Sequence, residues 1–267
     1  MRNYEIVKND YESTANEVAK LEEFLNANGF IKNVQNPVYV FVIGGDGTFL
    51  KAVHKYQDLL DQIYFVPFKF GGIGYYTNKN NLNEIKSLVE MIEKEECFQI
   101  NYQILELLNG KRKHYILNEV KILNEKRPLY IKLFINDEYL ETFHGTGIVV
   151  STPTGSTGYI KSTGGSVILP KNSGLYQLQE LVPVSTNIYR TLNSPIILNS
   201  DYVLRLELES LCETLICDTQ ERKILDNILE IKVSEKKVRV ISHRDPKQIS
   251  EINTLRDIFI IDKKSVK

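Results

Sequence analysis

Residues 38–50 of this 267-residue chain read Val-Tyr-Val-Phe-Val-Ile-Gly-Gly-Asp-Gly-Thr-Phe-Leu. Six apolar or aromatic residues run directly into a turn with three glycines, and residues with helical spacing follow. An unbroken apolar run rich in valine is typical of a strand that is buried on both faces, as in a parallel sheet. The glycines allow the backbone to turn sharply and to approach a ligand closely. The stretch therefore predicts a strand, a glycine turn and a helix at the centre of an α/β domain.

The glycine turn also predicts a phosphate-binding site. The following helix directs its N-terminal N–H groups and the positive end of its dipole at the turn, which suits an anion. The candidate phosphate-binding residues are Gly44, Gly45, Gly47 and Thr48. Asp46 is the only charged side chain in the turn, so we expect its carboxylate to hold a metal or to take a proton. The alternative is a tight strand-to-helix turn in which Asp46 only caps the helix.

The composition is that of an ordinary globular protein. Hydrophobic residues make up 42% of the chain and charged residues 25%, and the formal net charge is −1. Neither a nucleic acid nor an anionic membrane is therefore expected as a partner. The three cysteines form no CxxC pair, no apolar leader opens the sequence, and no apolar run of 18 residues occurs. These features predict a cytoplasmic protein with reduced thiols.

The first third of the chain alternates between strand and helix patterns. Strands are predicted over residues 4–7, 38–43 and 63–68. Apolar residues have helical spacing over residues 13–29, 49–56 and 82–93. Ser13 or Thr14 is the expected cap of the first helix. Strands that alternate with helices indicate βαβ units and a Rossmann-like parallel sheet.

From Phe98 the pattern changes to short alternating segments separated by turn residues. Asn109-Gly110 lies between two such segments and predicts a hairpin. Strands are predicted over residues 100–108, 114–117, 122–123, 129–135, 139–143, 202–208, 214–217, 223–225, 228–233 and 237–241, and one helix near residues 175–181.

The expected fold is α+β overall. An α/β domain over residues 1–97 carries the glycine turn, and a mainly-β, sandwich-like domain follows over residues 98–249. The pattern of residues 250–267 is ambiguous and fits a tail that returns to the first domain.

A second loop rich in glycine and hydroxyl groups follows another apolar strand. Residues 145–159 read Gly-Thr-Gly-Ile-Val-Val-Ser-Thr-Pro-Thr-Gly-Ser-Thr-Gly-Tyr. Hydroxyl and backbone N–H groups suit phosphate and ribose oxygens, and Tyr159 offers a face on which a base can stack. The alternative is a β-rich turn with a buried tyrosine. Asn118-Glu119, at the end of an apolar stretch, fits either a chelator of a ribose diol or an ordinary pair at a sheet edge.

Two common nucleotide motifs are absent from the sequence. It contains neither GxxxxGK[ST] nor a complete GxGxxG, which excludes a P-loop protein and the usual dinucleotide fingerprint. No Ser-His-Asp or Cys-His arrangement can be assigned either. Each taken by itself, His54 and His144 are therefore interpreted as surface or structural histidines rather than catalytic ones.

Taken in chain order, the motifs resemble the NAD kinase family. The resemblance is carried by GGDGTFL at residues 44–50, GGIGYYTN at 71–78, LNEV at 117–120, STPTGSTGY at 151–159, Gly164-Gly165 and Asp218-Thr219-Gln220. GGDG alone is shared with diacylglycerol, sphingosine and phosphofructo-kinases. Its combination with Asn-Glu and with STPTGSTxY is specific.

The resemblance implies an enzyme that transfers a phosphoryl group to the 2′-hydroxyl of the adenosine ribose of NAD and so makes NADP. It implies ATP or inorganic polyphosphate as the donor, Mg²⁺ or Mn²⁺ as a cofactor, and a homodimer or homotetramer with a partly shared site. Asp46 matches the proton acceptor of the family and is expected where the two domains meet. The residues that match NAD-binding positions are Asp46, Gly47, Phe49, Leu50, Tyr75, Asn118, Glu119, His144, Thr146, Thr157, Gly158, Tyr159, Ser162, Val182 and Gln220.

The chain departs from the family pattern at several positions. Thr146 stands where the family usually has Asp, His144 where it often has Arg, Gly158 where it has Ala and Thr219 where it has Gly. Two alternatives to a NAD kinase follow. A lipid or sugar kinase would share GGDG but would not explain the loop from Ser151. A sensor that binds NAD or NADP without turnover remains open, because Thr146 removes a charge from a ligand-contacting position.

Overall fold

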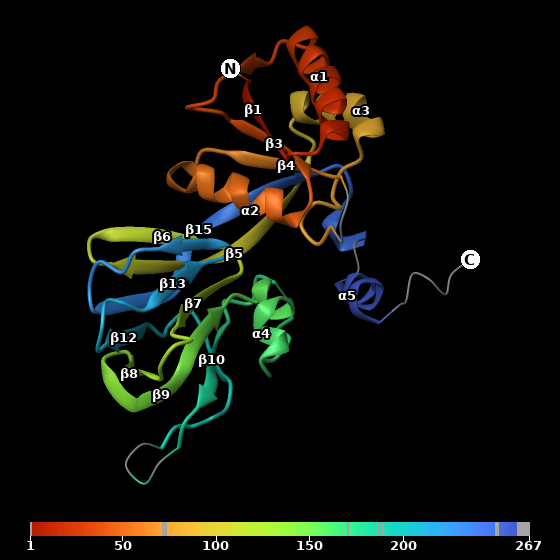
Figure 1. Cartoon of the computed structure of the whole chain (residues 1–267). Helices are drawn as coiled ribbons and strands as arrows, with labels where there is room; N and C mark the ends of the chain where they lie inside the picture. The colour runs from red at the N-terminus through yellow and green to blue at the C-terminus, as the bar shows by residue number, and fades with distance from the viewer. Residues whose placement is uncertain are drawn as a thin grey trace. The chain divides into compact units, whose positions relative to one another are not determined.

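The computed structural model describes residues 2–70, 74–169, 171–185, 187, 190–248 and 251–260. The chain divides into two compact units, and each is described by itself (Figure 1). The first unit consists of Met1–Asn101 and Arg239–Lys267, and the second of Tyr102–Val238. The predicted fold class is confirmed, since parallel strands with helices are followed by mainly β structure. Within the described residues, no helix has the length and apolar character needed to span a bilayer.

A parallel sheet forms the centre of the first unit. Its strand order is β15-β4-β3-β1-β2, and all of these neighbours run parallel. The strands are β1 (Asn3–Lys8), β2 (Ile31–Lys32), β3 (Tyr39–Gly44), β4 (Tyr64–Lys69) and the end of β15 (Ile228–Ser242). The helical segments are α1 (Glu12–Ala27), α2 (Asp46–Lys55), α3 (Ile85–Glu93) and α5 (Glu251–Phe259), with the short 3₁₀ turns η1 (Gln57–Leu59), η2 (Leu82–Glu84) and η4 (Pro246–Gln248).

Helices cover both faces of this sheet. α1 and α3 lie on one face and α2 on the other (Figure 1). Phe41 and Ile43 of β3 belong to the core that Leu25 of α1 completes, whereas Phe49 of α2 contacts Phe65, with ring centroids 5.5 Å apart, on the opposite face. Because successive side chains of a strand point to opposite faces, burial on both faces explains the unbroken apolar run before the glycine turn.

The start of α1 differs from the prediction. The helix begins at Glu12 after Tyr11, without a side-chain cap, so the predicted cap at Ser13 or Thr14 is wrong. Thr14 lies inside the first turn, and its hydroxyl donates a hydrogen bond to Asn9 Oδ1 at 2.6 Å. The hydroxyl therefore serves the loop before the helix rather than the N–H groups at the helix start.

The second unit is built from antiparallel strands around one apolar cluster. Its central strand, β9, pairs with β7, β8 and β10. The predicted hairpin at Asn109-Gly110 is confirmed by the pairing of β5 with β6. The strands are most of β5 (Phe98–Asn109), β6 (Arg112–Ile116), β7 (Glu119–Leu123), β8 (Leu129–Ile135), β9 (Glu138–Ser151), β10 (Tyr176–Pro183), β11 (Ile196–Leu198), β12 (Leu204–Leu208), β13 (Thr214–Cys217), β14 (Gln220–Arg222) and the first part of β15, with the short turns η3 (Gly155–Thr157) and α4 (Tyr159–Ser162).

The helix predicted near residues 175–181 is wrong. This segment forms β10, which pairs with both β9 and β11. Its residues 176–181 are all buried, and the Gln177 side chain exchanges hydrogen bonds of 2.9 and 2.7 Å with the backbone of Ser166. Strand pairing and burial on both faces therefore outweigh the helical spacing of its leucines.

Two other strand predictions are corrected near the end of the second unit. Residues 223–225 are not a strand, because their backbone pairs with a side chain. Asn109 Nδ2 donates to the Lys223 carbonyl at 2.9 Å, and Leu225 N donates to Asn109 Oδ1 at 2.8 Å. The two strands predicted over residues 228–233 and 237–241 form the single strand β15. Residues 239–242 of β15 belong to the first unit, whereas the sequence pattern placed the return at about residue 250.

Candidate functional site

The glycine turn connects the end of β3 to the N-terminus of α2 in the first unit. A Cβ on Gly44 would lie 2.4 Å from Thr48 Oγ1, so the packing of Thr48 requires glycine at position 44. A Cβ on Gly47 would meet nothing within 4 Å, so the described residues give no packing reason for this glycine. The backbone at Gly47 is therefore open to close approach by a ligand at a helix N-terminus, where anions are favoured.

Asp46 is the first residue of α2, and its carboxylate is held by the backbone of another loop. Tyr75 N donates to Asp46 Oδ2 at 2.9 Å, and Oδ1 accepts from Tyr76 N at 2.8 Å and from Thr77 N at 3.4 Å. Gly74, with φ of +78°, provides the turn that presents these amides. α2 has no side-chain cap, so the alternative in which Asp46 only caps its helix is wrong. The three amides fix the orientation of the carboxylate.

Three other predicted NAD-binding residues of this unit are buried. Phe49 is fully buried, and its ring stacks on Tyr76 with centroids 5.1 Å apart. Leu50 is 5% and Tyr75 9% exposed. These side chains pack around the loop that holds Asp46, and their contact with NAD stays a prediction. Of the second glycine motif, residues 71–73 lie outside the described part of the chain.

In the second unit, Asp218 holds the Asn118-Glu119 pair through its backbone. The Asp218 carboxylate accepts hydrogen bonds from Leu117 N at 3.1 Å, Asn118 N at 2.6 Å and Glu119 N at 3.2 Å. Asp218 is 2% exposed and has a φ of +53°. Its own N–H donates to the Glu119 carbonyl at 2.8 Å. The junction between β6 and β7 is therefore anchored by one buried carboxylate.

The hydroxyl-rich loop packs directly on this junction. Thr152 Oγ1 donates to the Leu117 carbonyl at 2.7 Å and accepts from Gly155 N at 3.0 Å. A Cβ on Gly155 would lie 2.2 Å from the Asn118 carbonyl oxygen, so only glycine permits this approach. The structure thus brings together two sequence motifs that were identified separately.

A lysine connects Glu119 to Tyr159. Lys121 Nζ lies 3.4 Å from Glu119 Oε1 and 4.7 Å from the centroid of the Tyr159 ring. Glu119 is 6% exposed, whereas Tyr159 is 41% exposed. Burial raises the pKa of Glu119 to about 7; Lys121 acts against this shift and Asp218 adds to it. At neutral pH, Glu119 is therefore near the midpoint of its titration, and the ring of Tyr159, which also lies beside Lys121, is accessible.

Of the other predicted residues, Gly158 borders this group. A Cβ on Gly158 would lie 3.7 Å from Glu119 Oε2, so this glycine is next to the carboxylate. Thr157 Oγ1 donates to the Thr154 carbonyl at 3.1 Å. Ser162 is exposed at the end of α4. Gln220 begins β14, and its side-chain oxygen accepts a hydrogen bond from Arg222.

His144, Thr146 and Val182 form a separate group in the same unit. His144 stacks on Tyr130 with ring centroids 4.2 Å apart. Val182 is 71% exposed and has a φ of +46°, an uncommon conformation for a β-branched residue. On β9, Ser151 pairs with Glu119, so His144 lies seven residues away, roughly 20 Å along the strand. One chain does not bring this group to Glu119.

Lys121 and the anchoring role of Asp218 were missed from the sequence. Lys121 lies two residues after Glu119 on β7, so both side chains point to the same face of the strand. That spacing was a usable signal. Asp218 is 99 residues beyond Glu119, and no local pattern indicates that its side chain reaches back to the β6–β7 junction.

Two solved structures with this fold are an NAD kinase and an NADH kinase. The structure matches an NAD kinase from Archaeoglobus fulgidus solved in complex with ATP, with a TM-score of 0.76 and 20% identity over 97% of this chain and all of that one. It also matches yeast NADH kinase complexed with NADH, with a TM-score of 0.75 and 17% identity over 100% of this chain and 90% of that one. At these identities the likeness shows the fold.

Sequence relatives identify the family. Residues 117–243 match the model of the ATP-NAD kinase C-terminal domain. The NAD kinase of Lactobacillus johnsonii is 38% identical over 77% of this chain and 77% of its own length. That of Limosilactobacillus reuteri is 36% identical over 85% of this chain and 86% of its own length. The chain belongs to the NAD kinase family, which confirms the resemblance seen in its motifs.

Membership in this family makes the chain a transferase that phosphorylates NAD. The alternatives drawn from the sequence, a lipid or sugar kinase and a sensor without turnover, are not favoured, because the relatives are NAD kinases across most of the chain.

Proposed function

We propose that this chain transfers the terminal phosphoryl group of ATP, or of inorganic polyphosphate, to the 2′-hydroxyl of the adenosine ribose of NAD. The observation that supports this most directly is the Asp46 carboxylate, which three backbone amides orient at the N-terminus of α2. The ATP complex of the Archaeoglobus fulgidus NAD kinase supports ATP as the donor. That relation makes ATP the first donor to test.

Asp46 acts as the proton acceptor in this proposal. A carboxylate is a weak base toward a sugar hydroxyl, but positioning and charge neutralisation do most of the work in a loose phosphoryl-transfer transition state. Asp46 therefore orients the 2′-hydroxyl and accepts its proton late, as the bond to phosphorus forms. The open backbone at Gly47 and the N–H groups at the start of α2 would hold phosphate oxygens.

The group around Glu119 would bind the ribose and the base. Asn118 and Glu119 have the amide and carboxylate that can hydrogen-bond a ribose diol, and their backbone is anchored by Asp218. Tyr159 offers an accessible ring for stacking. The segment from Thr157 to Ser162 would enclose the dinucleotide from the same side.

The described residues do not form a metal site of their own. No three of their His, Cys, Asp and Glu side chains gather closely enough to hold an ion. A Mg²⁺ or Mn²⁺ ion would therefore take most of its ligands from the donor phosphates and from water, as is common for Mg²⁺. The divalent cofactor stays a prediction.

His144, Thr146 and Val182 support a site shared between subunits. His144 and Thr146 lie seven and five residues along β9 from Ser151, the residue that pairs with Glu119, so we infer that a second copy of the chain makes their predicted contact with NAD. This favours a homodimer or homotetramer in which one subunit supplies this group to another. The cytoplasmic location and the lack of nucleic-acid and membrane partners stay predictions from composition.

The test is formation of NADP by the purified protein with NAD, Mg²⁺ and either ATP or polyphosphate. We expect Asp46→Asn to lower kcat by roughly 10²–10⁴ with little change in the Kd for NAD. Asp58→Asn, at an exposed aspartate of η1, is the matched control. Near-normal turnover by Asp46→Asn would exclude the role of Asp46. Binding of NAD without NADP formation by the wild type would favour the sensor.

A further inference from the structure

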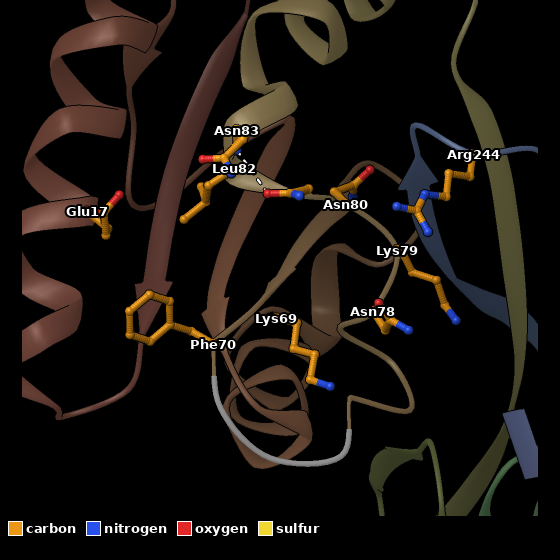
Figure 2. A pocket seen from close by; sticks show the side chains of 10 residues that line it. Glu17, Lys69, Phe70, Asn78, Lys79, Asn80, Leu82, Asn83 and Arg244 are labelled. Atoms are coloured by element: carbon orange, nitrogen blue, oxygen red, sulfur yellow. Dashed lines mark hydrogen bonds between the residues drawn. The ribbon is translucent and has the colours of Figure 1, made fainter. Parts of the chain in front are cut away.

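A cation-rich cavity lies beyond the end of β4 in the first unit. It has a volume of about 460 Å³, and Lys69, Lys79 and Arg244 line it together with a single acidic residue, Glu17 (Figure 2). The chain as a whole has a net charge of −1, so this surplus of positive charge is local. The cavity is not lined by the glycine turn at Gly44–Gly47, and the proposed roles of that turn leave its cations unexplained.

Asn80 builds the wall of this cavity. Its side-chain amide donates to the Pro67 carbonyl at 3.1 Å and to the Ile241 carbonyl at 2.9 Å. Its side-chain oxygen accepts from His243 N at 2.7 Å. These bonds connect Asn80 to β4 and to the end of β15. Lys79 precedes Asn80 and Arg244 follows His243, and both cations line the cavity (Figure 2).

The cations of the cavity differ in their surroundings. Lys79 is 5% exposed, whereas Lys69 and Arg244 are exposed. Within the described part of the chain, neither Lys69 nor Arg244 forms an ion pair. Both are therefore available to an anionic ligand, and the amide side chain of Asn78 lies between Lys69 and Lys79 in the lining (Figure 2).

The cavity is connected to the loop that holds Asp46. A Cβ on Gly74 would lie 2.7 Å from Lys69 Cδ, so the lysine stem packs on the turn that precedes the three amides bound to Asp46. Asn78 N donates to the Gly74 carbonyl at 3.1 Å, which closes the same turn. One short segment thus orients the proposed proton acceptor at one end and lines the cationic cavity at the other.

We propose that this cavity binds the oligophosphate chain of the phosphoryl donor, an inference that rests on the proposed function. Phosphate oxygens form strong charge-assisted hydrogen bonds with Lys and Arg, and Arg can bind them in a bidentate manner. Lys69 and Arg244 supply the accessible charges, and Asn80 holds the segments that carry Lys79 and Arg244 in a fixed geometry. The same chemistry suits the triphosphate of a nucleotide and inorganic polyphosphate.

The experiment measures binding of tripolyphosphate and of ATP to the full chain by calorimetry, without NAD. We expect Lys69→Gln and Arg244→Gln each to raise the Kd by roughly tenfold, the scale of one lost hydrogen bond to a charged group. Lys94→Gln and Arg112→Gln, at exposed positions outside the cavity lining, should leave it unchanged. The Kd for NAD should stay at the wild-type value in all four variants.

The two ligands distinguish the source of the phosphate chain. Weakened binding of both supports a site for the shared chain, weakened ATP binding alone supports a nucleotide site, and weakened tripolyphosphate binding alone supports a polyphosphate site. Wild-type affinity of Lys69→Gln and Arg244→Gln for both ligands would overturn the inference. The binding experiment contains no NAD and does not depend on catalysis. Failure of the wild type to make NADP in the separate activity assay would therefore count against the proposed function only.

Discussion

Lys121 Nζ lies 3.4 Å from the Glu119 carboxylate and 4.7 Å from the centre of the Tyr159 ring, so one cation serves two proposed ligand-binding side chains. The carboxylate is buried and the ring is accessible. Lys121 thereby compensates part of the cost of burying a negative charge and holds the ring beside it.

Removing this cation should change the pH dependence of NAD binding. Burial raises the pKa of Glu119 to about 7, and Lys121 opposes this shift. In Lys121→Met the pKa of Glu119 rises further. As the pH falls, the carboxylate therefore becomes protonated at a higher pH than in the wild type. We expect the KM for NAD at pH 6.5 to increase roughly five- to tenfold, since one pKa unit is a tenfold change in protonation ratio, and to recover toward pH 8.5.

The matched control is Lys132→Met, at an exposed position of β8. It should keep the wild-type pH profile of kcat/KM. An equal loss of affinity at every pH in Lys121→Met would show that Lys121 acts only through packing.

Asp218→Asn should loosen the β6–β7 junction without changing the backbone conformation, because Asn tolerates the positive φ of position 218. Leu117 N bonds to one carboxylate oxygen and the N–H groups of Asn118 and Glu119 bond to the other, so replacing one oxygen with an NH₂ group, which cannot accept, removes one or two of the three bonds. We expect a loss of about 1–3 kcal/mol in the free energy of unfolding and a KM for NAD that rises more than kcat falls. Urea unfolding and steady-state kinetics measure the two effects.

Asp226→Asn is the control, since Asp226 is exposed and accepts a single N–H bond from Ile228 at 3.1 Å. Its stability and KM should stay close to the wild type. Equal changes in the two variants would contradict the anchoring role of Asp218.

Gly47 and Gly44 should respond to alanine in opposite ways. Gly47→Ala adds a methyl group that meets nothing in the protein, and alanine in a helix is favoured over glycine by up to about 1 kcal/mol. We expect unchanged or higher stability but a kcat/KM reduced by roughly tenfold or more, the scale of one lost contact to a charged group. Gly44→Ala should lose about 1–3 kcal/mol of stability, because its methyl group would collide with Thr48. Thermal unfolding measures the stability of the two variants, and NADP formation measures their kcat/KM. A loss of stability in Gly47→Ala would indicate that Gly47 has a structural role instead.

A buried carboxyl pair in the second unit predicts a pH-dependent stability. Asn193 N donates to Glu180 at 3.2 Å and Leu192 N donates to Glu141 at 2.8 Å. Burial, with the hydrogen bond to Glu141, raises the pKa of Glu180 above its usual range. The protonated form is therefore the stable one, and its contribution is present at low pH and lost as the pH rises through the raised pKa.

Glu180→Gln mimics the protonated form and should remove this loss. We expect its Tm to exceed that of the wild type by about 2–4 °C at pH 9, the shift expected for roughly 1 kcal/mol in a chain of this size, and the difference to shrink below pH 6. Calorimetry across this range measures it. Glu221→Gln, at an exposed position of β14, should follow the wild type, and a constant difference at all pH values would contradict the titration of Glu180.

Local patterns predicted the parts of the fold that depend on local physics. The apolar run before Gly44 is buried on both faces, and Asn109-Gly110 starts a hairpin, because these signals belong to the segments themselves. Residues 175–181 were predicted as a helix since their leucines have helical spacing. Only pairing with β9 and β11, which are distant in sequence, makes them a strand.

The candidate site shows the same division. The motifs at Asp46, at Asn118-Glu119 and at Tyr159 were identified from residue types that suit phosphate, ribose and a base. The contacts that hold these motifs in place were not identified from the sequence. They are the bonds from the amides of Tyr75 and Tyr76 to Asp46, the bonds to the Asp218 carboxylate, and the approach of Gly155 to Asn118. Each of these contacts joins segments that are far apart in the sequence, and no local pattern predicts the geometry that brings them together.

The bonds of Asn80 determine the order in which the chain can complete its fold. Its partners Ile241 and His243 follow it by 161 and 163 residues, and the whole second unit, Tyr102–Val238, lies between them. During synthesis, the parallel sheet must wait for its β15 strand until the intervening unit has emerged from the ribosome. Contacts that span so much of a chain form slowly. The second unit, continuous in sequence, can mature first, and its arrival closes the sheet that began at the N-terminus.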